Sequence, residues 1–145
     1  MTIRIALAAI AAALVTAALV ATAGSAQAPA GTTLHLVSKS DKSVGYFPKH
    51  RPRAGDRVGF GDTVSGDDTG YDRGACTVVG RGSLLCTIQV QLAKGTLSAQ
   101  GIVPQRSKNT PVAIIGGTGA YDGASGTALV TDVNTTTTDI TVTLR

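Results

Sequence analysis

The sequence of 145 residues contains no glutamate and no tryptophan, and it has only two cysteines, two histidines and five aromatic residues. All nine acidic residues are aspartate, whose short side chain suits turns and strand starts better than helix interiors. Together with abundant threonine, valine and glycine, this favours an all-β protein. The few cysteines and histidines form no metal cluster and no hydrolase triad, so we expect neither a metal nor a cofactor.

The beginning of the chain has the pattern of a secretory signal. Arg4 precedes an alanine-rich apolar run from Ile5 to Ala23, and Ala26-Gln27-Ala28 provides an Ala-x-Ala cleavage site. An uncleaved anchor is the alternative, because about 18 apolar residues can cross a bilayer. We expect cleavage after Ala28, a secreted protein, and no membrane attachment afterwards.

Residues 29–145 then form a single domain of 145 − 28 = 117 residues, with 12 basic and 9 acidic side chains once Arg4 is removed. Positive charge concentrates in residues 49–53, beside two prolines that exclude a regular element. Nucleic-acid binding is one interpretation of this segment, and a solvated loop is the other. The segment has no interleaved aromatic residues and export removes the usual partner, so we expect no nucleic acid.

One aspartate stands on an apolar strand face. In residues 56–64, Val58, Phe60, Asp62 and Val64 alternate with polar residues and glycines, so they share one face of a strand. A carboxylate among apolar side chains has a raised pKa unless a cation or hydrogen-bond donors offset its burial. Asp62 is therefore a candidate acid, base or ligand anchor, and the alternative is a residue at the rim that caps a loop.

The two cysteines fall on one predicted hairpin. Strands over 72–79 and 83–92 flank Gly80-Arg81-Gly82, and a loop centred on Arg81 pairs positions whose numbers sum to 162. Cys76 and Cys86 are then directly opposite, which predicts a disulfide in an exported protein. Free reactive thiols are the alternative, but neither cysteine has a neighbouring histidine or a Cys-x-x-Cys context.

Period-two patterns and turn residues predict eight strands, over residues 33–38, 56–64, 72–79, 83–92, 96–103, 112–116, 127–133 and 138–144. Eight antiparallel strands with one apolar face close into a barrel, and a β-sandwich is the alternative from pattern alone. The long polar segment 39–54 is expected to be a loop, with Tyr46 and Phe47 as anchors across a cavity mouth. Asp67, Asp68 and Asp72 lack the spacing of a calcium loop.

A glycine-rich segment joins two of these strands. Residues 114–128 read as a strand, a turn at Tyr121 and a second strand. A phosphate loop is excluded because the third glycine, the Gly-Lys-Ser/Thr sequence and a following helix are all missing. The glycines are expected to let two strands pass closely, with Tyr121 as a plug.

The same segment resembles a known family. Gly116-Gly117-Thr118-Gly119-Ala120-Tyr121 followed by Ala124-Ser125-Gly126 is similar to the signature of dirigent proteins and allene oxide cyclases. Blocks at 55–62, 70–76, Cys86 and 92–101 also follow the order found in bacterial members of this superfamily. The resemblance implies an eight-stranded antiparallel β-barrel, usually assembled as a homotrimer, and it decides for the barrel over the sandwich.

The resemblance also implies a function. Members of this superfamily bind a small apolar or phenolic molecule and steer its cyclisation or coupling without a cofactor. Asp62 and Tyr121 would then be catalytic. The ligand-binding residues would be Val58, Phe60, Tyr46 and Asp132. Ser125 replaces an arginine that the signature often has, which removes a cationic partner, and a non-catalytic binding or structural barrel is the alternative.

Overall fold

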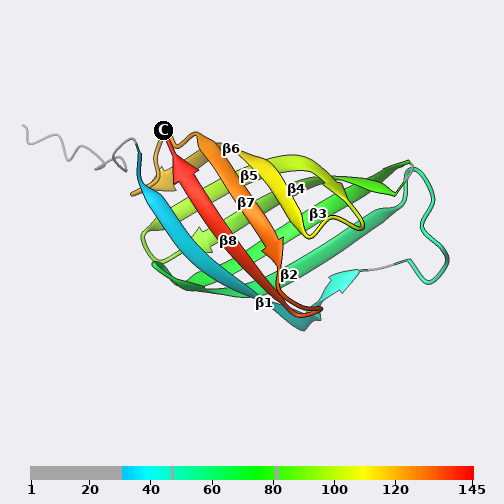
Figure 1. The fold of residues 1–145 in the computed structure, drawn as a ribbon. Helices are drawn as coiled ribbons and strands as arrows, with labels where there is room; N and C mark the ends of the chain where they lie inside the picture. The colour runs from blue at the N-terminus through cyan, green and yellow to red at the C-terminus, as the bar shows by residue number, and fades with distance from the viewer. Residues whose placement is uncertain (1–30, 47, 81) are drawn as a thin grey trace, which may run out of the picture.

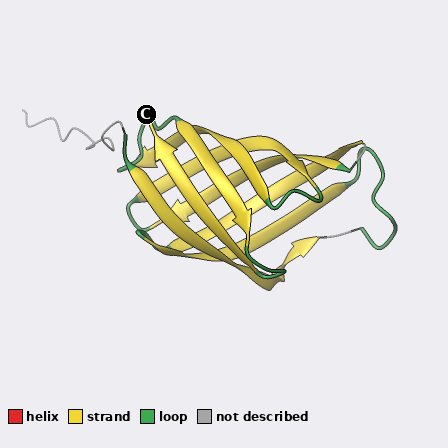
Figure 2. Cartoon of the chain, viewed as in Figure 1, coloured by secondary structure: helices red, strands yellow, loops and turns green. Residues whose placement is uncertain are grey.

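The computed structural model describes residues 31–46, 48–80 and 82–145. The expected signal segment, Phe47 and Arg81 lie outside the described residues. The described chain is built from strands, turns and loops without a helix (Figure 2), so it holds no helix that could cross a membrane.

Eight strands close into one antiparallel barrel, which confirms the predicted fold. Each strand pairs with the next along the chain, and β8 pairs with β1 to complete the circle (Figure 1). Closure leaves no unpaired sheet edge. The strands are β1 Thr33–Tyr46, β2 Arg57–Gly66, β3 Gly70–Gly80, β4 Ser83–Leu92, β5 Gly95–Pro104, β6 Asn109–Gly119, β7 Gly126–Asp132 and β8 Thr137–Leu144.

The first strand is longer than predicted. The polar segment from Lys39 onward was expected to be a loop, but β1 continues to Tyr46. Ser40 pairs with Asp62 and Gly45 pairs with Phe60, so the register shifts between these pairs and an irregularity takes up the extra residues. Backbone pairing with β2 therefore keeps this polar segment in the sheet even though its sequence shows no clear alternation.

The predicted disulfide is confirmed. Cys76 on β3 and Cys86 on β4 are direct partners in the hairpin register and form a disulfide. Both are nearly fully buried inside the barrel. The register argument located the bridge because a short hairpin loop fixes which residues lie opposite each other.

The two ends of the barrel differ. One end carries the connections 47–56, 81–82, 105–108 and 133–136, and the other carries 67–69, 93–94 and 120–125 with the C-terminus. Figure 1 shows the β1–β2 connection at one end and the C-terminus at the other. An internal cavity reaches Gln105 and Ser107 at the first end, and its lining includes no residue of the second end's connections. We call these the open end and the closed end.

Candidate functional site

The barrel encloses a cavity of about 370 Å³ that reaches the open end. Its walls are mainly apolar and come from all eight strands. The apolar side chains that line it include Leu36, Val58, Phe60, Ile88, Leu97 and Val112. Ligand pockets in proteins commonly have volumes of about 300 to 1,000 Å³, apolar walls and a few polar groups. The interior of this barrel therefore has room for one small molecule.

The polar centre of the cavity is a pair of carboxylates bridged by a serine. Asp62 on β2 and Asp72 on β3 are direct register partners, and both line the cavity. The Ser38 hydroxyl on β1 lies 2.9 Å from Asp62 Oδ2 and 3.2 Å from Asp72 Oδ2. It has one proton, so it donates to one carboxylate at a time. Three neighbouring strands thus bring two acidic groups and one hydroxyl together.

Asp72 holds its proton more tightly than an ordinary aspartate. Burial raises the pKa of Asp72 to about 6, and repulsion from the Asp62 carboxylate adds to this effect. Hydrogen bonds from the Ser38 hydroxyl and the Asp62 amide act in the opposite direction, as does the charge of Arg73, but they do not cancel it. Asp72 therefore gains and loses a proton in mildly acidic solution.

One oxygen of this cluster has no partner. Asp62 Oδ1 is buried and accepts no hydrogen bond from any residue that the structure describes. A buried carboxylate oxygen without a donor is costly, and such groups in native proteins usually have a functional reason or bind water. Asp62 lines the cavity, but Oδ1 itself has almost no accessible surface, so a ligand could bond to it only after the carboxylate rotates.

Phe60 owes its position to a glycine. Phe60 is the register partner of Gly74 on β3, and a Cβ atom at Gly74 would collide with the Phe60 ring. The ring therefore lies over the glycine and forms part of the cavity wall. Val58, one pleat nearer the open end, also lines the cavity, as the strand alternation predicted.

Sequence analysis missed Asp72 and Ser38 as members of the site. A hairpin centred on residue 67 pairs positions that sum to 134, which places Asp72 opposite Asp62. Ser38 continues the inward face of Leu34 and Leu36. The register of the β2–β3 hairpin is therefore a local pattern from which the position of Asp72 opposite Asp62 could be predicted.

The other expected site residues lie elsewhere, with one exception. Asp132 lines the cavity, and the Thr138 hydroxyl lies 3.5 Å from its Oδ1. Tyr46 is 66% exposed and is not part of the cavity wall. Tyr121 is 3% exposed at the closed end and does not line the cavity either. Ser125 is in the same closed-end connection, so an arginine at that position would not face the carboxylate pair.

Tyr121 belongs to a separate polar cluster with Asp68. The Tyr121 hydroxyl donates to Asp68 Oδ2 at 2.8 Å, and the amides of Thr69 and Lys94 donate to the same carboxylate at 2.8 and 3.3 Å. Burial alone raises the pKa of Asp68, but these hydrogen bonds and the Lys94 charge outweigh it and hold the pKa below its usual 3.8. Burial and the Asp68 carboxylate raise the pKa of Tyr121, so its hydroxyl stays protonated.

Among the described residues, no group of three or more His, Cys, Asp or Glu side chains is arranged to hold a metal ion. Asp67 and Asp68 accept backbone hydrogen bonds in the β2–β3 turn, from His35 and from Thr69 and Lys94 respectively. Asp72 lies apart from them in the cavity wall.

Comparison with solved structures finds proteins of similar architecture. A pyocyanin demethylase matches with a TM-score of 0.69 and 29% sequence identity over 79% of this chain and 100% of its own. Two pterocarpan synthase dirigent proteins match with TM-scores of 0.64 and 0.65 at 18% and 22% identity, over 77% and 81% of this chain and 84% and 97% of theirs. The barrel fold of this chain is dirigent-like. No protein-family model and no curated protein matches the chain.

The segment that carried the resemblance has a structural role in this dirigent-like barrel. A Cβ atom at Gly117 would collide with the carbonyl oxygen of Tyr121, and Gly119 has a φ of +64°, which favours glycine. These glycines let the chain fold tightly under Tyr121 at the closed end. The signature therefore marks the fold, and the cavity chemistry comes from β1, β2 and β3.

Proposed function

We propose that this protein binds a small apolar or phenolic molecule inside the barrel and steers its cyclisation or isomerisation without a cofactor. One observation carries the proposal: two carboxylates bridged by a serine hydroxyl stand in the wall of an apolar cavity. An apolar pocket with few polar groups selects one conformation of a bound molecule and excludes water from it. The similar structures are named for pyocyanin and pterocarpan, both small aromatic compounds, which supports this ligand class.

The two carboxylates have complementary roles in this proposal. Asp72, with a pKa of about 6, donates a proton to an oxygen or nitrogen of the ligand. Asp62 accepts a proton or hydrogen bond from a ligand hydroxyl once its carboxylate rotates to bring the unpartnered Oδ1 to the cavity. Rotation of the protonated Asp62 carboxyl group then turns its O–H towards Ser38, whose hydroxyl accepts this proton while it donates its own to Asp72. One proton is given and one is taken, so an isomerisation of this kind needs no oxidant or reductant.

A barrel that binds its ligand without converting it is the second candidate. It is favoured by the position of Tyr121, which was expected to be the second catalytic group but bonds to Asp68 outside the cavity. A binding protein needs the apolar walls and one polar anchor, both of which Asp62 and its neighbours supply.

We also propose that the protein is exported and assembles as a homotrimer. The Cys76–Cys86 disulfide supports export, because such bonds persist in oxidising compartments. Exposed apolar side chains on the outer faces of β4 to β7 support assembly, since another copy would cover them. These side chains are Leu85, Ile102, Ile115 and Leu129. Native mass spectrometry of protein from its own culture medium tests both points: a monomer, or a chain that still carries residues 1–28, would contradict them.

Ligand binding is tested by displacement of a neutral fluorescent probe, N-phenyl-α-naphthylamine. We expect α-naphthol to displace it better than α-methoxynaphthalene, because only the naphthol hydroxyl can donate a hydrogen bond to the Asp62 carboxylate. Asp62→Asn should reduce the preference for naphthol about tenfold, the usual size of a hydrogen bond to a charged group. Asp122→Asn, an exposed aspartate at the closed end, is the matched control. Failure of all three compounds to bind would reject the cavity as a ligand site.

Turnover is the test that separates the two candidates. Pyocyanin is the first compound to assay, followed by any molecule that native mass spectrometry finds in the purified protein. An enzyme should lose turnover in Asp72→Asn while retaining affinity for the compound, because asparagine cannot donate the acidic proton. A barrel in which neither the wild type nor the variant converts its own bound molecule is a binding protein.

A further inference from the structure

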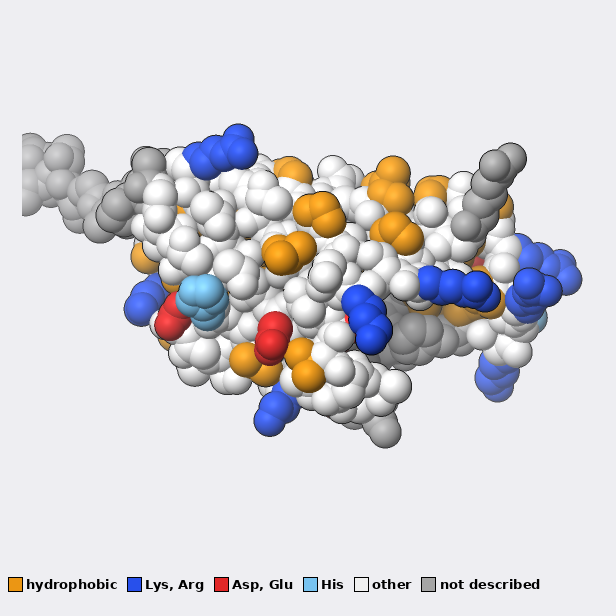
Figure 3. All heavy atoms as spheres, in the orientation of Figure 1, with side chains coloured by type: hydrophobic (Ala, Val, Ile, Leu, Met, Phe, Trp, Pro, Cys, Tyr) orange, Lys and Arg blue, Asp and Glu red, His pale blue; other side chains and the backbone are white. Residues whose placement is uncertain are grey.

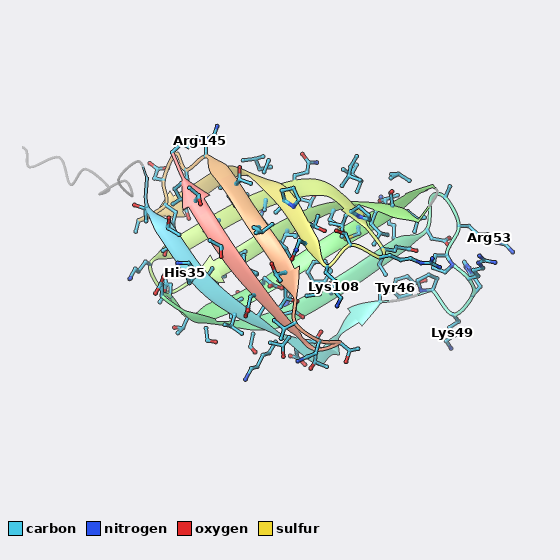
Figure 4. The ribbon with its side chains drawn as sticks, viewed as in Figure 1. His35, Tyr46, Lys49, Arg53, Lys108 and Arg145 are labelled. Atoms are coloured by element: carbon cyan, nitrogen blue, oxygen red, sulfur yellow. A yellow bond between two sulfur atoms is a disulfide. The ribbon has the colours of Figure 1, made fainter. Side chains whose placement is uncertain are left out.

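Positive charge gathers at the open end of the barrel. Six basic residues lie in its connections or at the strand start beside them: Lys49, Arg51, Arg53, Arg57, Arg106 and Lys108. All six are exposed. Figure 3 shows Lys and Arg side chains concentrated towards this end, and Figure 4 labels Lys49, Arg53 and Lys108 there. The described residues of its connections contain a single aspartate, Asp56. Its Oδ2 lies 3.5 Å from Nδ1 of His50.

Two of these arginines line a second pocket beside the cavity mouth. The pocket has a volume of about 470 Å³ and lies between the β1–β2 connection and the β5–β6 turn, with Arg51 and Arg106 in its wall. Pro104 and Gln105 line both this pocket and the main cavity, so the two spaces adjoin. Within the described chain, neither arginine has an ion pair with a carboxylate. Their guanidinium groups are therefore available to a ligand.

Building on the proposed function, we infer that the natural ligand is an anionic amphiphile. Its apolar body occupies the barrel cavity, and its carboxylate, sulfonate or phosphate group occupies the second pocket beside Arg51 and Arg106. Guanidinium groups bind oxyanions through paired hydrogen bonds, and a mouth lined with one sign of charge attracts the opposite sign.

The charges also fix the orientation of such a ligand. Asp62 lies five positions along β2 from Arg57, which is roughly 16 Å of strand. An anionic group deep in the cavity would be repelled by Asp62 and Asp72, whereas the same group at the mouth is attracted by arginine. The apolar or phenolic part of the molecule is therefore directed to the carboxylate pair.

A matched pair of probes tests this inference on the intact protein. Anilinonaphthalene sulfonate and N-phenyl-α-naphthylamine share the same apolar body, and only the first has a sulfonate. We expect the wild type to bind the sulfonate about tenfold more tightly at low ionic strength, and added salt to remove most of that preference. Arg51→Gln and Arg106→Gln should each weaken sulfonate binding about threefold and leave the neutral probe unchanged.

Arg145→Gln is the matched control, because it removes the same charge from the closed end, where Figure 4 labels Arg145. Equal affinity for both probes, or an equal loss of sulfonate binding in Arg145→Gln, overturns the anionic ligand class. In either case, continued binding of the neutral probe means that the cavity function still holds. Loss of both probes overturns the cavity function as well. Competition by naphthoic acid and by naphthyl phosphate then distinguishes a carboxylate ligand from a phosphate ligand.

Discussion

The closed-end connection and the cavity wall contain buried aspartates, four positions apart in the chain, in opposite electrostatic states. Asp68 at the closed end is 6% exposed and accepts hydrogen bonds from three donors, so its pKa is lowered. Asp72, in the cavity wall, is 4% exposed, and burial together with repulsion from the neighbouring Asp62 carboxylate raises its pKa to about 6. Both side chains have little exposed surface, but Asp72 lies deeper in the protein interior, so burial raises its pKa more. The Asp62 charge adds to this effect, whereas the donors to Asp68 outweigh its burial.

This difference separates a structural aspartate from a chemical one. Asp68 joins three connections, because it bonds to Tyr121 and Lys94 as well as to its own turn. The Asp62–Asp72 pair leaves one oxygen unbonded and places two like charges side by side, which costs stability. Such an arrangement is typical of sites whose chemistry requires a shifted pKa.

The largest expected effect comes from Asp68→Ala. The substitution leaves the amides of Thr69 and Lys94 and the Tyr121 hydroxyl without their acceptor. We expect the free energy of unfolding to fall by about 2 to 3 kcal/mol, because the Tyr121 hydroxyl is left buried without an acceptor and the two part-buried amides lose theirs. Urea denaturation measures this. Asp122→Ala, an exposed position in a closed-end connection, should change it by less than about 0.5 kcal/mol. Similar values for the two variants would remove the structural role of Asp68.

Asp72→Asn should have the opposite sign. A raised pKa means that the folded protein favours the protonated form, so this contribution is complete below pH 3.8 and is lost as pH rises through about 6. Asparagine imitates the neutral acid. At pH 8 the variant should be more stable than the wild type, by on the order of 2 kcal/mol, and near pH 4 the two should be almost equal.

Asp68 should titrate in the other direction, because its lowered pKa gives stability that is present above 3.8 and lost as pH falls further. Thermal melts of the wild type, Asp72→Asn and Asp122→Asn between pH 4 and pH 8 test the statement on Asp72. Melts of the wild type and Asp68→Ala below pH 3.8 test the statement on Asp68. A wild type and Asp72→Asn that differ equally at pH 4 and pH 8 would be inconsistent with a raised pKa at Asp72.

The smallest of the three effects is expected for Tyr121→Phe. Removing the hydroxyl deletes one hydrogen bond to a charged acceptor while the ring still fills its buried site. We expect a loss of about 1 to 2 kcal/mol of stability and no change in affinity for the neutral naphthylamine probe. If turnover were lost while stability was unchanged, Tyr121 would be catalytic, and the distinction between a structural Tyr121–Asp68 cluster and a chemical site in the cavity would be wrong.

Several features of the fold could be predicted because they depend on local pattern. The alternation of Val58, Phe60 and Asp62 placed these side chains in the interior, and the hairpin register paired Cys76 with Cys86. The length of β1 could not be predicted, because its polar second half stays in the sheet through backbone pairing with β2. Tyr121 was correctly expected to fill space, but its Asp68 partner lies 53 positions away in sequence and no local pattern links them.

The sequence by itself determined the all-β class, the eight strands, the disulfide and the inward position of Asp62. These follow from side-chain periodicity, turn residues and hairpin register, which act over a few residues. Only the tertiary structure decided that Ser38, Asp62 and Asp72 form one cluster and that Tyr121 lies away from it. Barrel closure, tilt and stagger set those distances, and they depend on how all eight strands pair around the circle.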